Sequence, residues 1–121
     1  MRVTARSLQK SGACEEGVED FLAYFPGGCK VTRENIILAR NFGLHVEWWA
    51  HKTIPGFCFI QTSVLGSRMD ARIAAKAEYD KSVNNGCLES DAYRKLSEDL
   101  ENAYDAYCEL LADEIMKAIE G

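Results

Sequence analysis

Residues 90–120 read SDAYRKLSEDLENAYDAYCELLADEIMKAIE, and this stretch decides the fold because its apolar residues recur at steps of three and four. At about 100° per residue, one face collects Tyr93, Leu96, Leu100, Tyr104, Tyr107, Leu111 and Ala118. The opposite face carries Asp91, Glu98, Glu101, Asp105, Glu109, Asp113 and Glu120. The pattern predicts one long amphipathic helix that is capped by Ser90.

A second helix is predicted just before it. Ser67 and Asp70 have the spacing of a capping box, and the break at Asn84-Asn85-Gly86 ends the helical pattern. A helix therefore runs from Ser67 to this break. Because the connection to the last helix is short, we expect residues 67–121 to form an antiparallel helical hairpin.

The N-terminal part, residues 1–66, is predicted to contain several short elements. A short strand at residues 2–4 precedes a helix from Thr4 to Gly12, and further helices span residues 14–25, 32–43 and 46–52. Residues 57–65 suit either a buried strand or a helix, and we favour the helix. The fold class is mainly α, a single domain over residues 1–121 with at most one or two short strands.

The predicted last helix is longer than a compact domain of this size. At about 1.5 Å per residue, residues 91–120 span roughly 44 Å, whereas a globule of this chain length is roughly 35 Å across. The helix is expected to overhang the domain. Because an overhanging apolar stripe needs cover in water, we expect a partner, either a second copy that makes a dimer or a different protein.

The negative charge is concentrated in the last helix. Residues 87–121 hold ten acids and three bases, a charge of −7, while residues 1–86 hold nine acids and eleven bases, a charge of +2, which gives the −5 of the whole chain. This balance argues against direct nucleic-acid binding. The acidic face is either an ordinary solvated surface or a footprint for a basic partner.

The cysteine pattern and the hydropathy predict a soluble protein of a reducing, cytoplasmic compartment. The five cysteines, at positions 14, 29, 58, 87 and 108, form no Cys-x-x-Cys pair and follow no secretory signal pattern. The longest apolar stretch, residues 54–65, is shorter than the roughly 20 residues that a membrane-spanning helix needs. We therefore expect free thiols and no membrane contact.

No catalytic or metal-binding motif surrounds the reactive residue types. Cys14 or Cys58 could act with His45 or His51 as a nucleophile and base, but nothing in the sequence places them together. The spacing of His45, Glu47 and His51 matches no known metal signature, so no metal or cofactor is expected. Trp48 and Trp49 are candidate partner anchors, although one of two adjacent helical residues usually lies in the core.

Residues 7–50 carry a recognisable series of motifs. They contain Gly12-Ala13-Cys14, Phe25-Pro26-Gly27, Val31-Thr32 and Trp48, and alanine- and tyrosine-rich helices follow. This series resembles a leader found in small proteins of bacteriophages and prophages. The resemblance brings no catalytic residues. It implies a protein of a mobile element, a class that includes inhibitors of host defence such as anti-CRISPR proteins.

Together these observations predict a non-enzymatic protein-binding module that blocks a basic, nucleic-acid-handling surface of a bacterial host complex. The predicted contact residues are Asp91, Glu98, Glu101, Asp105, Glu109 and Asp113, with Trp48 and Trp49. The alternative is a structural module in which the hairpin drives assembly and its charge maintains solubility. A cysteine-dependent enzyme is the third hypothesis.

Overall fold

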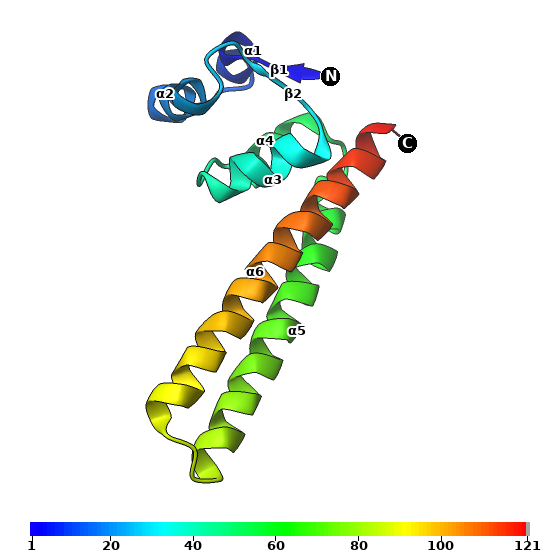
Figure 1. Ribbon diagram of the computed structural model, residues 1–121. Coiled ribbons are helices and arrows are strands. Elements are labelled where there is room, and N and C mark those ends of the chain that lie inside the picture. Colours follow the sequence, from blue (N-terminus) through cyan, green and yellow to red (C-terminus); the bar gives the residue numbers. More distant parts are fainter. Residues whose placement is uncertain (121) are drawn as a thin grey trace.

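The computed structural model describes residues 1–120, which form six helices and a two-stranded sheet. The elements in chain order are β1 (Arg2–Val3), α1 (Ala5–Lys10), α2 (Glu15–Tyr24), β2 (Cys29–Lys30), α3 (Arg33–Asn41), α4 (Val46–Thr53), α5 (Phe57–Asn84) and α6 (Glu89–Glu120). The elements before α5 form a compact body, and α5 and α6 form a long hairpin that projects beyond it (Figure 1). The predicted mainly α fold is confirmed.

The last helix is one continuous rod, as its periodicity predicts. It contains 32 residues, and residues 85–88 connect it to α5. At about 1.5 Å per residue the rod is roughly 48 Å long. Its end next to this connection lies far from the body (Figure 1), so the predicted overhang is confirmed.

Residues 57–65 are helical, as favoured above, and they belong to α5, which therefore begins ten residues before Ser67, so the predicted cap at Ser67 is wrong. Gly56 has a φ of 73°, a left-handed conformation that favours glycine, and α5 starts directly after it. Phe57 and Val64 are fully buried in the core, so packing holds this segment as helix. The hydroxyl of Ser67 donates to the carbonyl of Ser63 at 3.5 Å, which places it inside the helix.

The small elements of the body match the predicted boundaries. The hydroxyl oxygens of Thr4 and Thr32 accept the backbone N–H of Ser7 (3.1 Å) and of Asn35 (3.2 Å), so both residues cap helices. The predicted strand at residues 2–4 corresponds to β1, which pairs antiparallel with β2. The strand β2 was not predicted. Gly28 precedes β2 with a φ of 85°, and a Cβ there would lie 2.9 Å from the carbonyl oxygen of Val3.

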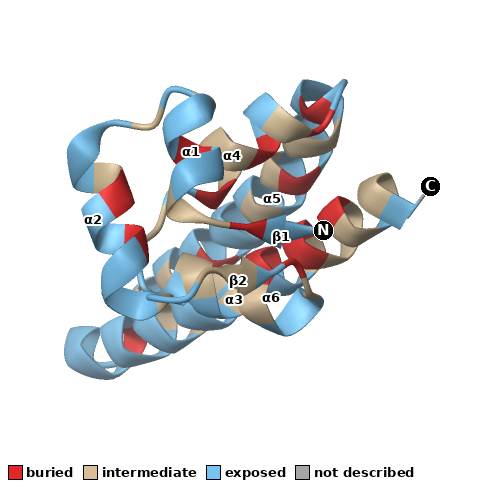
Figure 2. Cartoon of the chain, turned by 90° about the horizontal axis from the view of Figure 1, so that it is seen from above, coloured by how far each residue is buried: buried red, intermediate tan, exposed pale blue. Residues whose placement is uncertain are grey.

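Burial is uneven along the hairpin. We call residues 57–68 and 104–120 its near half, and residues 69–103 its far half. The near half contributes the fully buried side chains of Phe57, Val64, Cys108, Leu111 and Ile115 to the core beneath the body. In the far half the buried residues are three alanines, at positions 75, 92 and 103, while most of its surface is exposed (Figure 2). The core therefore ends where the body ends.

Candidate docking surface on the last helix

The predicted acidic residues all lie on α6 and face solvent. Asp91, Glu98, Glu101, Asp105, Glu109 and Glu120 are exposed, and Asp113 is half-buried. On a straight helix, Glu98, Glu101, Asp105 and Glu109 fall on one side over roughly 16 Å. We call these four residues the acidic face.

Only part of the predicted acidic surface is neutralised by the chain itself. Arg33 of α3 donates to the carboxylate of Asp113 at 2.7 Å, and Arg94 lies 4.0 Å from Asp91. Asp113 is thus engaged within the fold. Within residues 1–120, no ion pair forms with any residue of the acidic face. The four carboxylates remain available to an external basic group.

The two tryptophans lie apart from the acidic face. Trp48 and Trp49, on α4, are both half-buried, and both pack against the core. They line an apolar pocket of about 430 Å³ in the body, partly open to solvent, together with side chains such as Phe21 and Ile36. Lys52 lies 5.9 Å from the Trp48 ring centre. Both tryptophans therefore border this pocket, and their role as partner anchors stays a prediction.

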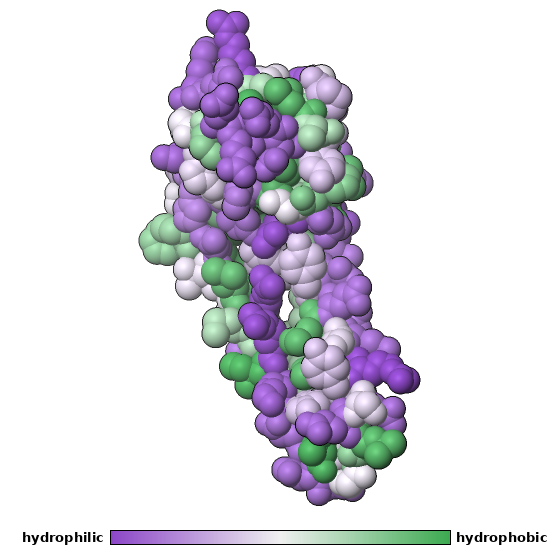
Figure 3. All heavy atoms as spheres, turned by 90° about the vertical axis from the view of Figure 1, so that its left-hand side faces the viewer, coloured by the Kyte–Doolittle hydropathy of each residue, from purple (hydrophilic) through white to green (hydrophobic). Residues whose placement is uncertain are grey.

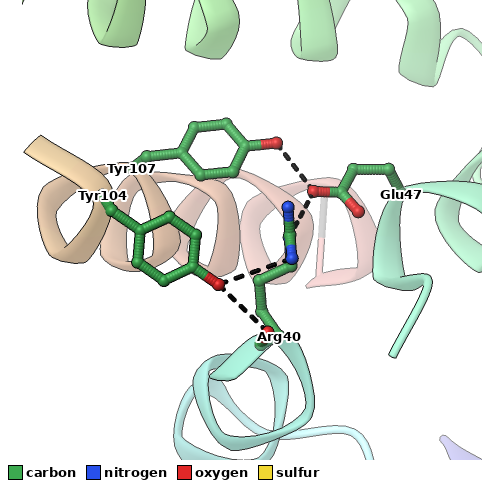
Figure 4. Close-up of polar contacts among 4 residues, drawn as sticks. All are labelled: Arg40, Glu47, Tyr104 and Tyr107. Carbon is green, nitrogen blue, oxygen red and sulfur yellow. Dashed lines mark hydrogen bonds and ion pairs between the residues drawn. The ribbon is translucent and has the colours of Figure 1, made fainter. Parts of the chain in front are cut away.

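A polar junction joins the body to the hairpin, and the sequence did not predict it (Figure 4). Glu47 of α4 accepts the Nε–H of Arg40 at 2.8 Å and the hydroxyl of Tyr107 at 2.7 Å. The hydroxyl of Tyr104 donates to the carbonyl of Arg40 at 3.1 Å. The guanidinium of Arg68, on α5, lies 4.9 Å from the Tyr107 ring centre and 5.4 Å from that of Tyr104. Four helices thus meet at this junction.

The junction fixes its own protonation states. Burial raises the pKa of Glu47, but the hydrogen bond from Tyr107 and the charge of Arg40 outweigh it, so this pKa lies below its ordinary value. Burial, together with the bond to Glu47 and the charge of Glu47, raises the pKa of Tyr107 well above its ordinary value. Both groups therefore keep one protonation state near neutral pH. The arrangement is suited to holding α3 and α4 on the hairpin.

A signal for the junction exists in the sequence. Tyr104 and Tyr107 are three residues apart on one helical face, and both carry a hydroxyl that requires a partner when buried. Arg40 and Glu47 are opposite charges on either side of the turn at Gly43. Sequence reasoning treated the tyrosines only as apolar residues and considered Glu47 only as a metal ligand.

Of the candidate thiols and histidines, Cys14 and His51 make other contacts. The Sγ of Cys14 accepts the backbone N–H of Gly17 at 3.4 Å at the start of α2. Cys58 is exposed near the start of α5. The Nε2 of His51 bonds to the side-chain oxygen of Gln61, and its ring packs edge-on against Phe57. Cys14 and His45 both line the apolar pocket of the body, and none of the hydrogen bonds described above joins a cysteine to a histidine.

Residues 1–120 also bear on two further site types, a metal centre and a membrane-spanning helix. Within that range, no three His, Cys, Asp or Glu side chains converge on a point where a metal ion could sit. The same residues contain no helix with the length and hydropathy needed to cross a bilayer. Comparisons with known protein families, curated proteins and solved structures find no match to this chain.

Proposed function

We propose that this chain is a non-enzymatic protein-binding module. Its acidic face docks on a basic surface that a host protein or ribonucleoprotein uses to hold nucleic acid. The observation that carries the proposal is the set of four exposed carboxylates, Glu98, Glu101, Asp105 and Glu109, which have no ion pair within residues 1–120. Such a cluster attracts a cationic surface and speeds association with it.

The chain's own α3 gives a precedent for this mode of binding. Arg33 of α3 donates to Asp113 of α6, the helix that carries the acidic face, at 2.7 Å. The charges of Glu109 and Asp113 both act on the guanidinium of Arg33. A cationic side chain can therefore approach α6 from outside and form a charge-assisted hydrogen bond. The acidic face offers the same chemistry one to four turns closer to the hairpin tip.

The resemblance of residues 7–50 to phage and prophage proteins directs the choice of partner. Bacterial defence complexes of the CRISPR type hold their nucleic acids in positively charged channels. A rigid anionic rod matches such a channel in charge, although its carboxylates are more widely spaced than phosphates. The proposed activity is inhibition of a defence complex in the bacterial cytoplasm by occupying such a channel.

The test uses two variants with equal charge. The first reverses the acidic face with Glu98→Lys, Asp105→Lys and Glu109→Lys. The control reverses three exposed acids elsewhere, with Glu19→Lys, Asp70→Lys and Glu78→Lys. Each set of three reversals changes the charge of −5 by six units to +1. Each protein is used to capture partners from a bacterial extract at about 50 mM and about 500 mM salt.

A partner of the acidic face is retained by the wild type and the control, and is lost with the face variant or at high salt. The captured protein is then assayed for nucleic-acid binding, which the wild-type chain is expected to block. Equal capture by the face variant and the control, or capture that does not block nucleic-acid binding, would contradict the proposal.

A second candidate function is assembly. Large apolar side chains of the far half are exposed, among them Met69, Ile73 and Tyr93. Exposed apolar groups along one rod are typical of helices that pack on another protein chain. This surface differs from the acidic face, so the two functions are compatible.

A further inference from the structure

The far half of the hairpin exposes an apolar stripe that continues the buried face of the near half. On α6, Leu111 is 0% exposed and Tyr107 is 4% exposed, whereas Leu100 is 37% and Tyr93 is 62% exposed. These residues follow at steps of four and seven, so they share one face. Hydrophobic residues continue along the hairpin below the body (Figure 3).

The helix α5 contributes a matching row of apolar side chains. Leu65 packs against the core, and Met69 and Ile73 follow at four-residue steps with 59% and 64% of their surface exposed. We define the hairpin stripe as Met69, Ile73, Tyr93, Leu96 and Leu100. In the near half, α3 contacts α6, so the body covers the α6 face that Tyr93, Leu96 and Leu100 continue. On a straight α5, Met69 and Ile73 lie about 140° and 180° from the buried Val64, so they extend the edge beside Leu65 and not the buried face.

We propose that a second copy of this chain covers the hairpin stripe, so that two far halves pack against one another in an antiparallel, two-fold dimer. The antiparallel arrangement follows from the position of the body. A parallel pair would bring both bodies to the same end of the shared face, where they would collide. With the bodies at opposite ends, only the two uncovered far halves overlap.

The charges around the stripe favour a second copy over a basic partner. On a straight helix, Glu98, Asp105 and Glu109 lie about 120–180° away from Tyr93 and Leu100, and Glu101 lies about 80–100° away from them. The acidic faces of two copies therefore point outward, away from the contact. On the α5 side, Lys76 follows Met69 by seven residues and so lies within the stripe, with Arg72 beside it, and both charges repel a cationic surface.

Two-fold symmetry makes the stripe complementary to itself. An axis that crosses α5 near Lys76 brings Arg72 of each copy to Asp80 of the other, because both lie four residues from Lys76. Asp80 already accepts from Lys76 at 3.0 Å and can accept a further donor. On α6, the same axis brings Leu100 of one copy towards Tyr93 of the other.

The available area predicts a dimer of moderate affinity. The far half measures roughly 22 Å by 20 Å, so a pair buries about 900 Å², close to the lower limit for specific interfaces. The dissociation constant is therefore expected in the micromolar range. Added salt screens the repulsion between two chains of −5 charge, so the dimer should persist or tighten as salt rises.

The test measures the mass of the purified chain by sedimentation equilibrium from about 1 µM to about 200 µM. The wild type is expected to change from monomer to dimer. Leu100→Glu or Met69→Glu should keep it monomeric. Leu22→Glu changes a leucine of similar exposure, 39%, on α2 and should leave the dimer intact. Circular dichroism establishes that each variant is folded.

A charge exchange tests the proposed arrangement without touching the apolar residues. Arg72→Asp or Asp80→Arg alone should weaken the dimer about tenfold, and the two together should restore most of the affinity. A wild type that stays monomeric at about 200 µM overturns the proposal, even if the stripe variants lose another captured protein. A dimer that Leu100→Glu and Met69→Glu leave unchanged overturns it as well. Neither result bears on the acidic face, whose binding weakens with salt.

Discussion

The near and far halves of the hairpin are built from the same two helices but are held by different forces. In the near half, Leu111 and Ile115 are completely buried, because α3 and α4 cover the face that they form. In the far half, the two helices bury only alanines between them, at positions 75, 92 and 103. The comparison teaches that an amphipathic pattern specifies a helix, while packing by other elements decides how much that helix stabilises the fold.

This difference predicts unequal effects of the same substitution, Leu→Ala, in the two halves. Leu111→Ala should lower the free energy of unfolding by about 3–4 kcal/mol, because it leaves a cavity in the core. Leu100→Ala removes a partly exposed side chain and should cost less than about 1 kcal/mol. Urea unfolding at about 1 µM protein, where a weak dimer contributes little, measures both values. Equal losses would show that the far half is as well packed as the near half.

The junction allows the same comparison with tyrosines. Tyr107→Phe removes the hydroxyl that donates to the charged Glu47 at 2.7 Å, so we expect a loss of about 2 kcal/mol. Tyr93→Phe removes a hydroxyl from a side chain that is 62% exposed in the far half and should change stability by less than about 0.5 kcal/mol. Thermal and urea unfolding of both variants provide the measurement. A neutral Tyr107→Phe would mean that the junction does not hold the body on the hairpin.

The raised pKa of Tyr107 adds a pH dependence to the stability of the near half. A group whose pKa is raised by folding stabilises the fold below its unfolded pKa of about 10, and this contribution is lost as pH rises towards the folded value. The loss is at most about 1.4 kcal/mol per pH unit. Tyr107→Phe should therefore lose less stability than the wild type between pH values of about 9 and 11. Parallel losses would show that folding leaves the pKa of Tyr107 unchanged.

Sequence periodicity was sufficient for the elements whose pattern is local. The helix α6, its continuity and its overhang follow from steps of three and four that persist over eight turns. The caps at Thr4 and Thr32 follow from the short-range chemistry of a hydroxyl and a first-turn amide. The acidic face was found for the same reason, because its members share one helix.

Features that depend on distant segments were missed. The start of α5 was placed at Ser67 because its local pattern resembles a cap, whereas the burial of Phe57 and Val64 extends the helix further back. The junction joins Glu47 to Tyr107, which are 60 residues apart. The engagement of Asp113 by Arg33, across 80 residues, removed one carboxylate from the predicted contact set. Such pairings depend on tertiary packing, which one sequence does not encode locally.

Ser67, at the boundary between the two halves, gives the smallest predicted change in the free energy of unfolding. This change is a gain in stability, whereas the changes above are losses. Because Ser67 lies inside α5, Ser67→Ala should raise the free energy of unfolding by roughly 0.5 kcal/mol through better helix propensity. At a true N-cap, loss of the hydroxyl lowers the free energy of unfolding. Thr32→Ala, which removes the acceptor of the Asn35 N–H, is the matched control and should cost about 1 kcal/mol. A loss of stability with Ser67→Ala, equal to that with Thr32→Ala, would mean that a helix begins at Ser67 and that the hairpin is interrupted where its two halves meet.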